Sequence, residues 1–237
     1  MDGILTLVNF GPEGWGDDIA AGVLVTVSLA LATLPFGLAV GFALSLAKTS
    51  QDATLRLAAN IYTTIFRGLP ELLTLFLVFY GAQIAIQQLA QMTGRSSGIE
   101  INAFVAGMVA LGAVFSAYSS EVFVSAFRAI PQGQYEGAYA IGLSRGRTMR
   151  LVILPQLIRL ALPGLSNLWL ILLKETALVS VIGLSDILRQ AGIAARVTRE
   201  AFLFFGVACL LYLVLALLSS VVLSTIERRV SVGGVMR

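Results

Sequence analysis

The chain alternates between long apolar stretches and short polar segments, and the apolar stretches show no two-residue alternation. Residues 19–47 contain no charged side chain, and further apolar stretches follow at about 57–88, 101–127, 157–182 and 201–226. About 18 or more apolar residues are enough to cross the hydrocarbon core of a membrane as a helix. Only helices and closed barrels satisfy the backbone there, and barrel strands would alternate. The pattern therefore predicts an all-α polytopic membrane protein with five transmembrane helices.

Composition agrees with this interpretation. The mean hydropathy is +0.89, and only 12% of the residues are charged, whereas soluble domains carry about 25%. Residues 1–237 show no linker, internal repeat or low-complexity tract, so we expect a single transmembrane domain. The N-terminus lacks the basic region of a signal peptide, so we expect the first helix to be retained.

The basic residues indicate how the chain is oriented, because lysine and arginine favour the cytoplasmic side. The first, third and last connecting segments hold ten of them: Lys48, Arg56, Arg128, Arg145, Arg147, Arg150, Arg159, Arg228, Arg229 and Arg237. The opposite side holds four, Arg95, Arg189, Arg196 and Arg199, and the N-terminal acids Asp2, Glu13, Asp17 and Asp18. The bias predicts an N-terminus outside and a C-terminus in the cytoplasm. It also accounts for the net charge of +3 without nucleic acid.

The third connecting segment, residues 130–155, is long, arginine-rich and bracketed by Pro131 and Pro155. The expected apolar side of a first short helix consists of Tyr135, Ala138, Tyr139 and Ile141. Gly142 is suited to end that helix and Ser144 to cap the next, which predicts a cytoplasmic helix-turn-helix elbow. A long connection with its own secondary structure favours contact with a partner. The alternative is an amphipathic helix that only lies on anionic headgroups.

The spacing within this elbow favours the first interpretation. Glu136-Gly137-Ala138, a glycine six residues after the glutamate and Leu154-Pro155 twelve residues after that glycine resemble the EAA loop of ABC importer permeases. In that family the loop docks in a cleft of the ATP-binding subunit. Gly137 replaces the usual first alanine and Val152 stands where isoleucine is common. The resemblance implies a coupling loop made of Tyr135, Glu136, Gly137, Ala138, Gly142, Leu143, Ser144, Arg145, Arg147, Leu154 and Pro155.

Further blocks of sequence resemble the polar amino acid permeases within that class. The segment Arg67-Gly68-Leu69-Pro70-Glu71 is similar to their Arg-Gly-x-Pro motif, with Arg67, Gly68 and Pro70 as its defining residues. Residues 117–121, 130–134 and 174–183 match other blocks, and the resemblance extends from about residue 26 to 230. The acidic Glu71 is typical of the permeases of histidine, lysine/arginine/ornithine and opine (octopine, nopaline) systems.

The resemblance implies partners and a location. Members of the family pair two permeases, identical or homologous, with two ATP-binding cassette subunits and an extracytoplasmic amino acid-binding protein in the bacterial inner membrane. This chain lacks a P-loop of its own, because Phe42 and Ala47 stand where glycines would precede Lys48-Thr49. We therefore expect a transport subunit that is not an enzyme and binds no cofactor, with ATP and magnesium on the partners. The absence of histidine and the single cysteine argue against a soft or imidazole metal site.

Five charges fall within the predicted spans, where an unpaired charge is costly: Arg67, Glu71, Glu121, Lys174 and Glu175. Arg67 and Glu71 are four residues apart and would share a helix face. Two interpretations are open: either the two side chains form an ion pair with each other, or Arg67 packs at a helix end and Glu71 faces the substrate path. Lys174 and Glu175 are adjacent, about 100° apart, and need separate partners. Pro35, Pro70 and Pro163 are expected to bend helices.

We expect a substrate path that includes Glu71, Glu121, Lys174, Glu175 and Thr176. Glu175, with Glu71 or Glu121, would contact the positive group of a basic amino acid or opine, and Lys174 or the backbone its carboxylate. The alternatives are structural ion pairs, a gating or bridging role for Glu121, and an ion-coupled secondary carrier. Inverted repeats would favour such a carrier, and none is visible. Asp186 and Arg189 are expected in a solvated loop, with contact to the binding protein as the alternative.

Overall fold

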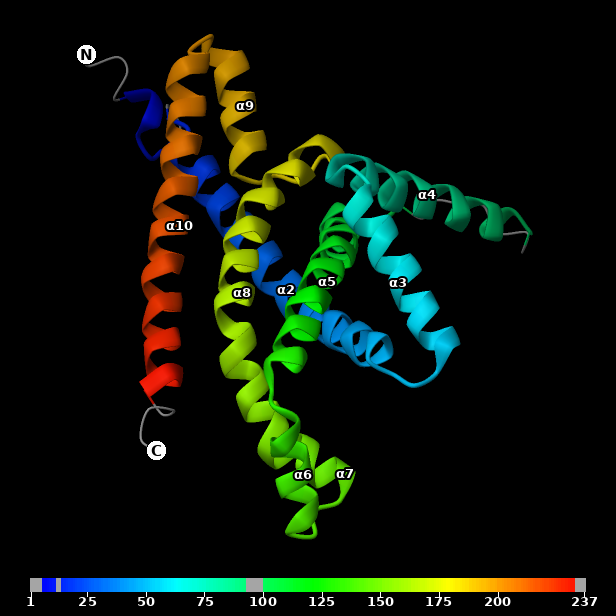
Figure 1. Cartoon of the computed structure of the whole chain (residues 1–237). Coiled ribbons are helices and arrows are strands. Elements are labelled where there is room, and N and C mark those ends of the chain that lie inside the picture. The colour runs from blue at the N-terminus through cyan, green and yellow to red at the C-terminus, as the bar shows by residue number, and fades with distance from the viewer. Residues whose placement is uncertain (1–5, 12–13, 93–99, 233–237) are drawn as a thin grey trace.

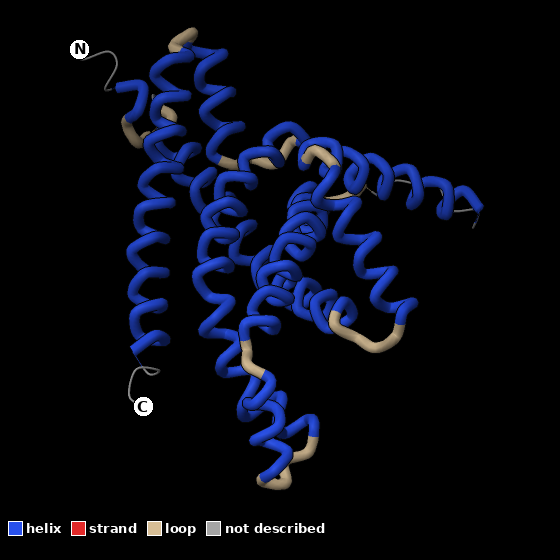
Figure 2. The backbone as a smooth tube through the Cα atoms, in the orientation of Figure 1, coloured by secondary structure: helices blue, strands red, loops and turns tan. Residues whose placement is uncertain are grey.

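The structure is a computed structural model that describes residues 6–11, 14–92 and 100–232. Within these ranges all the secondary-structure elements are helices (Figures 1 and 2). The elements are α2 (Gly16–Lys48), α3 (Ala53–Gly68), α4 (Glu71–Met92), α5 (Ala103–Ala129), α6 (Gln132–Ala140), α7 (Arg145–Thr148), η1 (Met149–Ile153), α8 (Leu154–Glu175), η2 (Thr176–Ile182), α9 (Ile187–Thr198) and α10 (Ala201–Val232). Asp2, Glu13, Arg95 and Arg237, which entered the orientation argument, lie outside the described residues.

Five helical segments of the described chain are long and apolar enough to cross a membrane, as the sequence predicts. They are Gly16–Lys48, Glu71–Met92, Ala103–Ala129, Arg145–Ile182 and Ala201–Val230. The first, third and fifth agree with the predicted ranges to within a few residues. The second and fourth differ from the prediction in ways that bear on function.

The second predicted helix, 57–88, is two helices. The break lies at Leu69, whose backbone is extended, with φ −87° and ψ 141°. Pro70 causes it, because proline lacks an N–H and disfavours a helical conformation in the residue before it. Pro35 and Pro163, by contrast, lie inside continuous helices. In Figure 1, α4 turns away from α3 at this break and projects to the side, away from α8 and α10.

The fourth predicted helix, 157–182, starts earlier and changes character along its length. Helical backbone is continuous from Arg145, through the π-helical turn η1 and α8, to the 3₁₀-helical η2. The segment ends at Gly183, whose φ of 99° lies in the left-handed region that glycine adopts without penalty. The elbow and the span above it therefore form one continuous element.

The segment between the last two spans is helical, whereas the sequence analysis expected a loop. α9 buries Ile187, Ala191, Ala194 and Ala195 on one face, and they pack with Phe204 of α10 and others in one apolar cluster. These positions follow the i, i+4, i+7, i+8 period of an amphipathic helix. The same apolar spacing is visible in the sequence, but the arginines in this segment are also typical of a polar loop.

The centre of the fold is the crossing of α2 and α5, and α5 is the most buried span. Small residues bring the two backbones together, as is typical of helix pairs in membranes. A Cβ added at Gly41 would lie 2.9 Å from the carbonyl oxygen of Ser116 and would overlap the Ser119 hydroxyl. The Ser119 hydroxyl also donates a hydrogen bond to the Gly37 carbonyl, at 3.4 Å. Gly37 and Gly41 thus set the separation of the two helices.

We expect Gly41→Ala to destabilise the chain, because the added methyl group meets the α5 backbone, which cannot yield as a side chain would. Overpacking of this kind costs about 1–3 kcal/mol. The measurement is the thermal unfolding midpoint of the purified chain in detergent. Gly81→Ala in α4 is the control, because its Cβ would meet nothing within 4 Å. Equal midpoints for both variants would contradict the role given to Gly41.

Candidate functional site

The Pro70 break and the change of α8 from α-helix to 3₁₀-helix lie side by side at one end of α5, and each places a glutamate there. Glu71 is the first residue of α4, directly after the Pro70 break, and Glu175 is the last residue of α8, where the 3₁₀ segment begins. Their carboxyl groups lie within hydrogen-bonding reach of each other, and both side chains are partly buried. Figure 1 shows η2 next to the start of α4. Residues 104 positions apart in sequence thus form one acidic pair.

The neighbours of Glu175 point in different directions, as their adjacency on a helix requires. Lys174 is exposed and close enough to act electrostatically on Glu175. Thr176, a predicted path residue, is fully buried, and its hydroxyl donates to the Leu173 carbonyl at 2.8 Å. Lys174 and the two glutamates are therefore accessible at this site, and Thr176 supports it from within.

Glu121 of α5 belongs to a separate cluster. Its Oε1 accepts hydrogen bonds from Lys48 Nζ at 2.6 Å and from Arg67 Nη1 at 2.8 Å. The Arg67 guanidinium also lies over the Tyr118 ring, 5.7 Å from its centroid. These contacts join the ends of α2 and α3 to the middle of α5, so Glu121 bridges neighbouring helices. Glu121 also borders a cleft of about 390 Å³ between α5 and α8, near Gly164.

The predicted ion pair between Arg67 and Glu71 is wrong. The four-residue spacing places two side chains on one face only if the helix is continuous, and the Pro70 break separates them. Arg67 instead pairs with Glu121, and Glu71 meets Glu175. The alternative interpretation, with Arg67 packing near a helix end, describes the structure better. Sequence reasoning missed Lys48 and Tyr118, because both are brought to this cluster from other helices by the fold.

The elbow predicted from the sequence is present in the structure. The Leu143 N–H donates to the Ala138 carbonyl at 3.1 Å and the Gly142 N–H to the Tyr139 carbonyl at 2.9 Å. With Gly142 at φ 83°, these bonds form a Schellman motif that ends α6. Ser144 occupies the N-cap position of α7, but its side chain makes no capping hydrogen bond.

The elbow has one anchored side and one free side. Ala138 is buried, and Tyr135 packs on the apolar cluster that joins the end of α5 to the start of α8. The remaining coupling-loop candidates are exposed or partly so: Glu136, Gly137, Gly142, Leu143, Ser144, Arg145, Arg147, Leu154 and Pro155. Tyr139 and Ile141 were expected on the packed side but are 47% and 77% exposed. Two apolar side chains therefore project from the free side.

Asp186 is buried and Arg189 is partly buried at the start of α9, so they do not lie in a solvated loop. The Asp186 side chain is fully buried and accepts a hydrogen bond from the Arg189 N–H at 2.9 Å, which caps α9. The Tyr212 hydroxyl reaches the same carboxyl group at 3.4 Å, and Arg189 Nη1 donates to the Ser180 carbonyl. Burial raises the pKa of Asp186, which lies between the last two spans, to about 6. The cluster ties α9 to its neighbours.

In the described part of the chain, no three histidine, cysteine, aspartate or glutamate side chains gather closely enough to hold a metal ion. The acidic pair contributes two carboxyl groups, and Glu121 is occupied by its two bases.

Comparison with known proteins places this geometry in context. The family model described as "Binding-protein-dependent transport system inner membrane component" matches residues 33–232. The nopaline transport system permease protein NocQ of Agrobacterium fabrum is 40% identical over 91% of this chain and 92% of its own length. The histidine/lysine/arginine/ornithine transport system permease protein HisQ of Salmonella typhimurium is 40% identical over 93% of this chain and 96% of its own.

Solved structures agree with the sequence relatives. A chain of an amino acid ABC transporter crystallised with histidines has a TM-score of 0.76 at 34% identity, over 91% of this chain and 95% of that one. A chain of the MetNI methionine ABC transporter, in an inward-facing conformation, has a TM-score of 0.67 at 21% identity, over 90% and 96%. The latter likeness concerns the fold alone. None of these proteins favours the ion-coupled carrier that the sequence left open.

The bridge at Glu121 generates a stability prediction. We expect Glu121→Gln to lower the unfolding midpoint, because the Lys48 side chain is only 7% exposed and would lose its anionic partner. Leaving a buried charged donor unpaired costs about 1–3 kcal/mol or more. The Lys48→Gln/Glu121→Gln double variant is expected to lose less than the sum of the two single variants.

The readout is the thermal midpoint of the purified chain, measured for both single variants and the double variant. Glu200→Gln, which changes an exposed acid at the start of α10, serves as the control. If the losses of stability in the two single variants simply add in the double variant, Lys48 and Glu121 are not energetically coupled. The ion pair would then not stabilise the chain.

Proposed function

The chain belongs to the family of binding-protein-dependent transport system inner membrane components, as a permease subunit of an amino acid or opine importer of the ABC type, and on this basis we propose that its solute is a basic amino acid or an opine. The observation that carries this proposal is the pairing of Glu71 with Glu175. The solute would bind at this pair during its passage across the inner membrane.

Electrostatics supports a cationic solute. Two carboxylates at hydrogen-bonding distance repel each other, and each gains when a cation enters between them. A guanidinium offers five donors in a planar fork that suits carboxylate oxygens, and its charge-assisted hydrogen bonds are strong. A basic amino acid or an opine derived from one supplies such a group. A neutral side chain would leave the two carboxylates facing each other.

The same site offers partners for the carboxylate of the solute. The first backbone N–H groups of α4 lack helical partners and carry the positive end of the helix dipole. Lys174 stands beside the acidic pair. The Pro70 break, next to the change from α-helix to 3₁₀-helix after Glu175, thus brings together donors for an anion and acceptors for a cation, as broken helices do in other transporters.

A second permease, identical or homologous, would complete the path. α3 and α4 expose apolar side chains that the isolated chain leaves uncovered, including Leu55, Ile61, Leu73, Leu77 and Ile84. This face carries Glu71 at its bend, so two permeases that meet here would enclose the acidic pairs between them. An extracytoplasmic binding protein would deliver the solute from the outer side.

Two ATP-binding cassette subunits would dock on the elbow, and ATP with magnesium would be bound there and not by this chain. The free side of the elbow combines Glu136, Arg145 and Arg147 with the exposed Tyr139 and Ile141. Closure of the ATPases on ATP would draw the two elbows together and open the cavity outward. Hydrolysis would return it to the inward-facing state.

The docking proposal predicts that Ile141→Glu releases the ATPase. Ile141 is 77% exposed, so the variant should fold, but a buried interfacial apolar anchor would become a charge. Loss of one anchor typically costs more than 2 kcal/mol, about thirtyfold in affinity. The measurement is the amount of ATPase that co-purifies with the tagged permease.

Val197→Glu is the matched control, because Val197 is 67% exposed on α9, at the other end of the molecule. The control variant should retain the ATPase. Full retention of the ATPase by Ile141→Glu would exclude this residue from the docking surface.

The solute proposal predicts that Glu175→Gln and Glu71→Gln each lower uptake of a basic solute about tenfold or more, because each removes a charge-assisted contact. The experiment uses the permease co-expressed with its partner permease and ATPase in vesicles, with binding protein loaded with arginine, histidine, ornithine or an opine. Uptake and ATPase stimulation are both measured, and stimulation identifies the solute. Glu200→Gln is expected to transport normally.

A structural role would give a different result. If the glutamates only stabilise the fold, the variants would lose assembly and basal ATPase activity together with uptake. Unchanged uptake of every basic solute by assembled Glu175→Gln and Glu71→Gln complexes would remove the proposal. Solute movement driven by an ion gradient without the ATPase would contradict the importer mechanism.

A further inference from the structure

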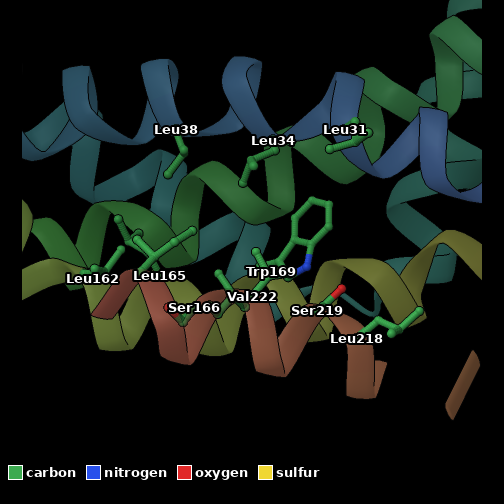
Figure 3. A pocket seen from close by; sticks show the side chains of 12 residues that line it. Leu31, Leu34, Leu38, Leu162, Leu165, Ser166, Trp169, Leu218, Ser219 and Val222 are labelled. Carbon is green, nitrogen blue, oxygen red and sulfur yellow. The ribbon is translucent and has the colours of Figure 1, made fainter. Parts of the chain in front are cut away.

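An apolar cleft of about 510 Å³ lies between α2, α8 and α10, within the spanning part of the molecule. Leu34 of α2, Leu165 and Trp169 of α8, and Leu218 and Val222 of α10 line it, and Figure 3 shows the side chains of these helices converging on the space. The Ser166 hydroxyl on its wall is buried and has no hydrogen-bond partner among the described residues. The cleft is large enough for an elongated apolar ligand.

A second cleft, of about 370 Å³, continues the same seam between α8 and α10. Leu162 borders both clefts, and the second also contains Arg159, Glu227 and Arg228. It lies toward the end of the bundle that carries the elbow (Figure 1). The seam is therefore apolar at one end and charged at the other.

The length of the seam matches one leaflet. Ten residues separate Arg159 from Trp169 on α8, which corresponds to about 15 Å at a rise of 1.5 Å per residue. Arg228 and Leu218 are equally far apart on α10. The hydrocarbon core of a bilayer is about 30 Å thick, so one leaflet contributes about 15 Å. The charged end would then stand at the headgroups while Trp169 lies near mid-membrane.

The seam opens on an apolar surface that the described chain leaves uncovered. α10 packs against α8 and α9, on the far side of α8 from α3 and α4 (Figure 1), and little of it is buried. Its outer surface exposes Leu210, Leu213, Leu217 and Val221. Glu71, which marks the solute site, lies with α3 and α4 on the opposite side. Lipid is thus the medium from which a ligand enters the seam.

We propose that this seam is a binding site for one anionic phospholipid, with an acyl chain in the cleft beside Trp169 and the phosphate on Arg159 and Arg228. Two arginines and Glu227 leave one net positive charge at the charged end, which a lipid of net negative charge neutralises. Each guanidinium has five donors and serves a phosphate while keeping a contact within the protein. Basic pockets between spans bind anionic headgroups in this way. On the predicted orientation, the lipid belongs to the cytoplasmic leaflet.

Trp169 provides a direct readout. The chain has two tryptophans, so Trp15→Phe leaves Trp169 as the sole emitter in the full chain. The chain is placed in phosphatidylcholine vesicles with rising fractions of chain-brominated phosphatidylglycerol or chain-brominated phosphatidylcholine, which quench tryptophan on contact. We expect half-quenching at a lower fraction of the anionic lipid, by about fivefold for each arginine that holds the phosphate.

Substitution of the charged end tests the assignment. Arg159→Gln with Arg228→Gln should make the two quenching curves coincide, whereas Arg56→Gln, at another connecting segment, should preserve the preference. Native mass spectrometry of the permease–ATPase complex should detect retained phosphatidylglycerol with wild-type chain and lose it with the double variant. This outcome is independent of which solute the importer carries.

Three results would overturn the proposal. Identical curves for both lipids in the wild-type chain would mean that ordinary annular lipid fills the seam. A preference that survives in the double variant would mean that the arginines do not hold the phosphate. Loss of Trp169 quenching when the partner permease is added would mean that a helix of that subunit covers the seam.

Discussion

Every backbone polar group in the hydrocarbon core must find its hydrogen bond within the protein, and the arrangement of this chain follows from that requirement. A helix can be interrupted only where something compensates for the lost bonds. Here the break at Pro70 lies beside the point after Glu175 where α-helix changes to 3₁₀-helix, and the 3₁₀ turns of η2 keep the backbone there hydrogen-bonded. The acidic pair, Glu71 and Glu175, lies at the same place where the regular α-helices end.

The rest of the core provides a rigid frame for that interruption. Small residues bring α2 against α5, and the Glu121 bridge joins the ends of α2 and α3 to the same helix. Asp186 fixes the start of α9 from inside the protein. Polar groups therefore have two distinct roles within the spans. Some are mutually satisfied and hold helices together, whereas Glu71 and Glu175 face each other, and in the proposed function they receive the cationic group of the solute.

The sequence predicted local features well and long-range pairings poorly. Apolar run length was enough to locate the spans, and the glycine after a short apolar helix was enough to locate the elbow at Gly142. The pairing of Arg67 with Glu121 could not be deduced, because it depends on how α3 packs against α5. The break before Pro70 could have been, since the residue preceding a proline resists helical geometry. The spacing of Arg67 and Glu71 indicates an ion pair only in a continuous helix, and the proline that interrupts the helix leaves Glu71 to meet Glu175 instead.

The π-helical turn η1 has a mechanical consequence for the whole molecule. It joins the elbow to the span that ends at Glu175, so that one unbroken rod runs from Arg145 to Ile182. If the ATPase docks on the elbow as proposed, torque applied there would be delivered to the acidic pair without an intervening joint. The π-helical turn also sets the rotation of the elbow relative to Glu175 about the helix axis. One residue more or less in this turn would rotate one relative to the other by about 100°. The rotation of the elbow about the helix axis, relative to the span, is therefore fixed by the single π-helical turn between them.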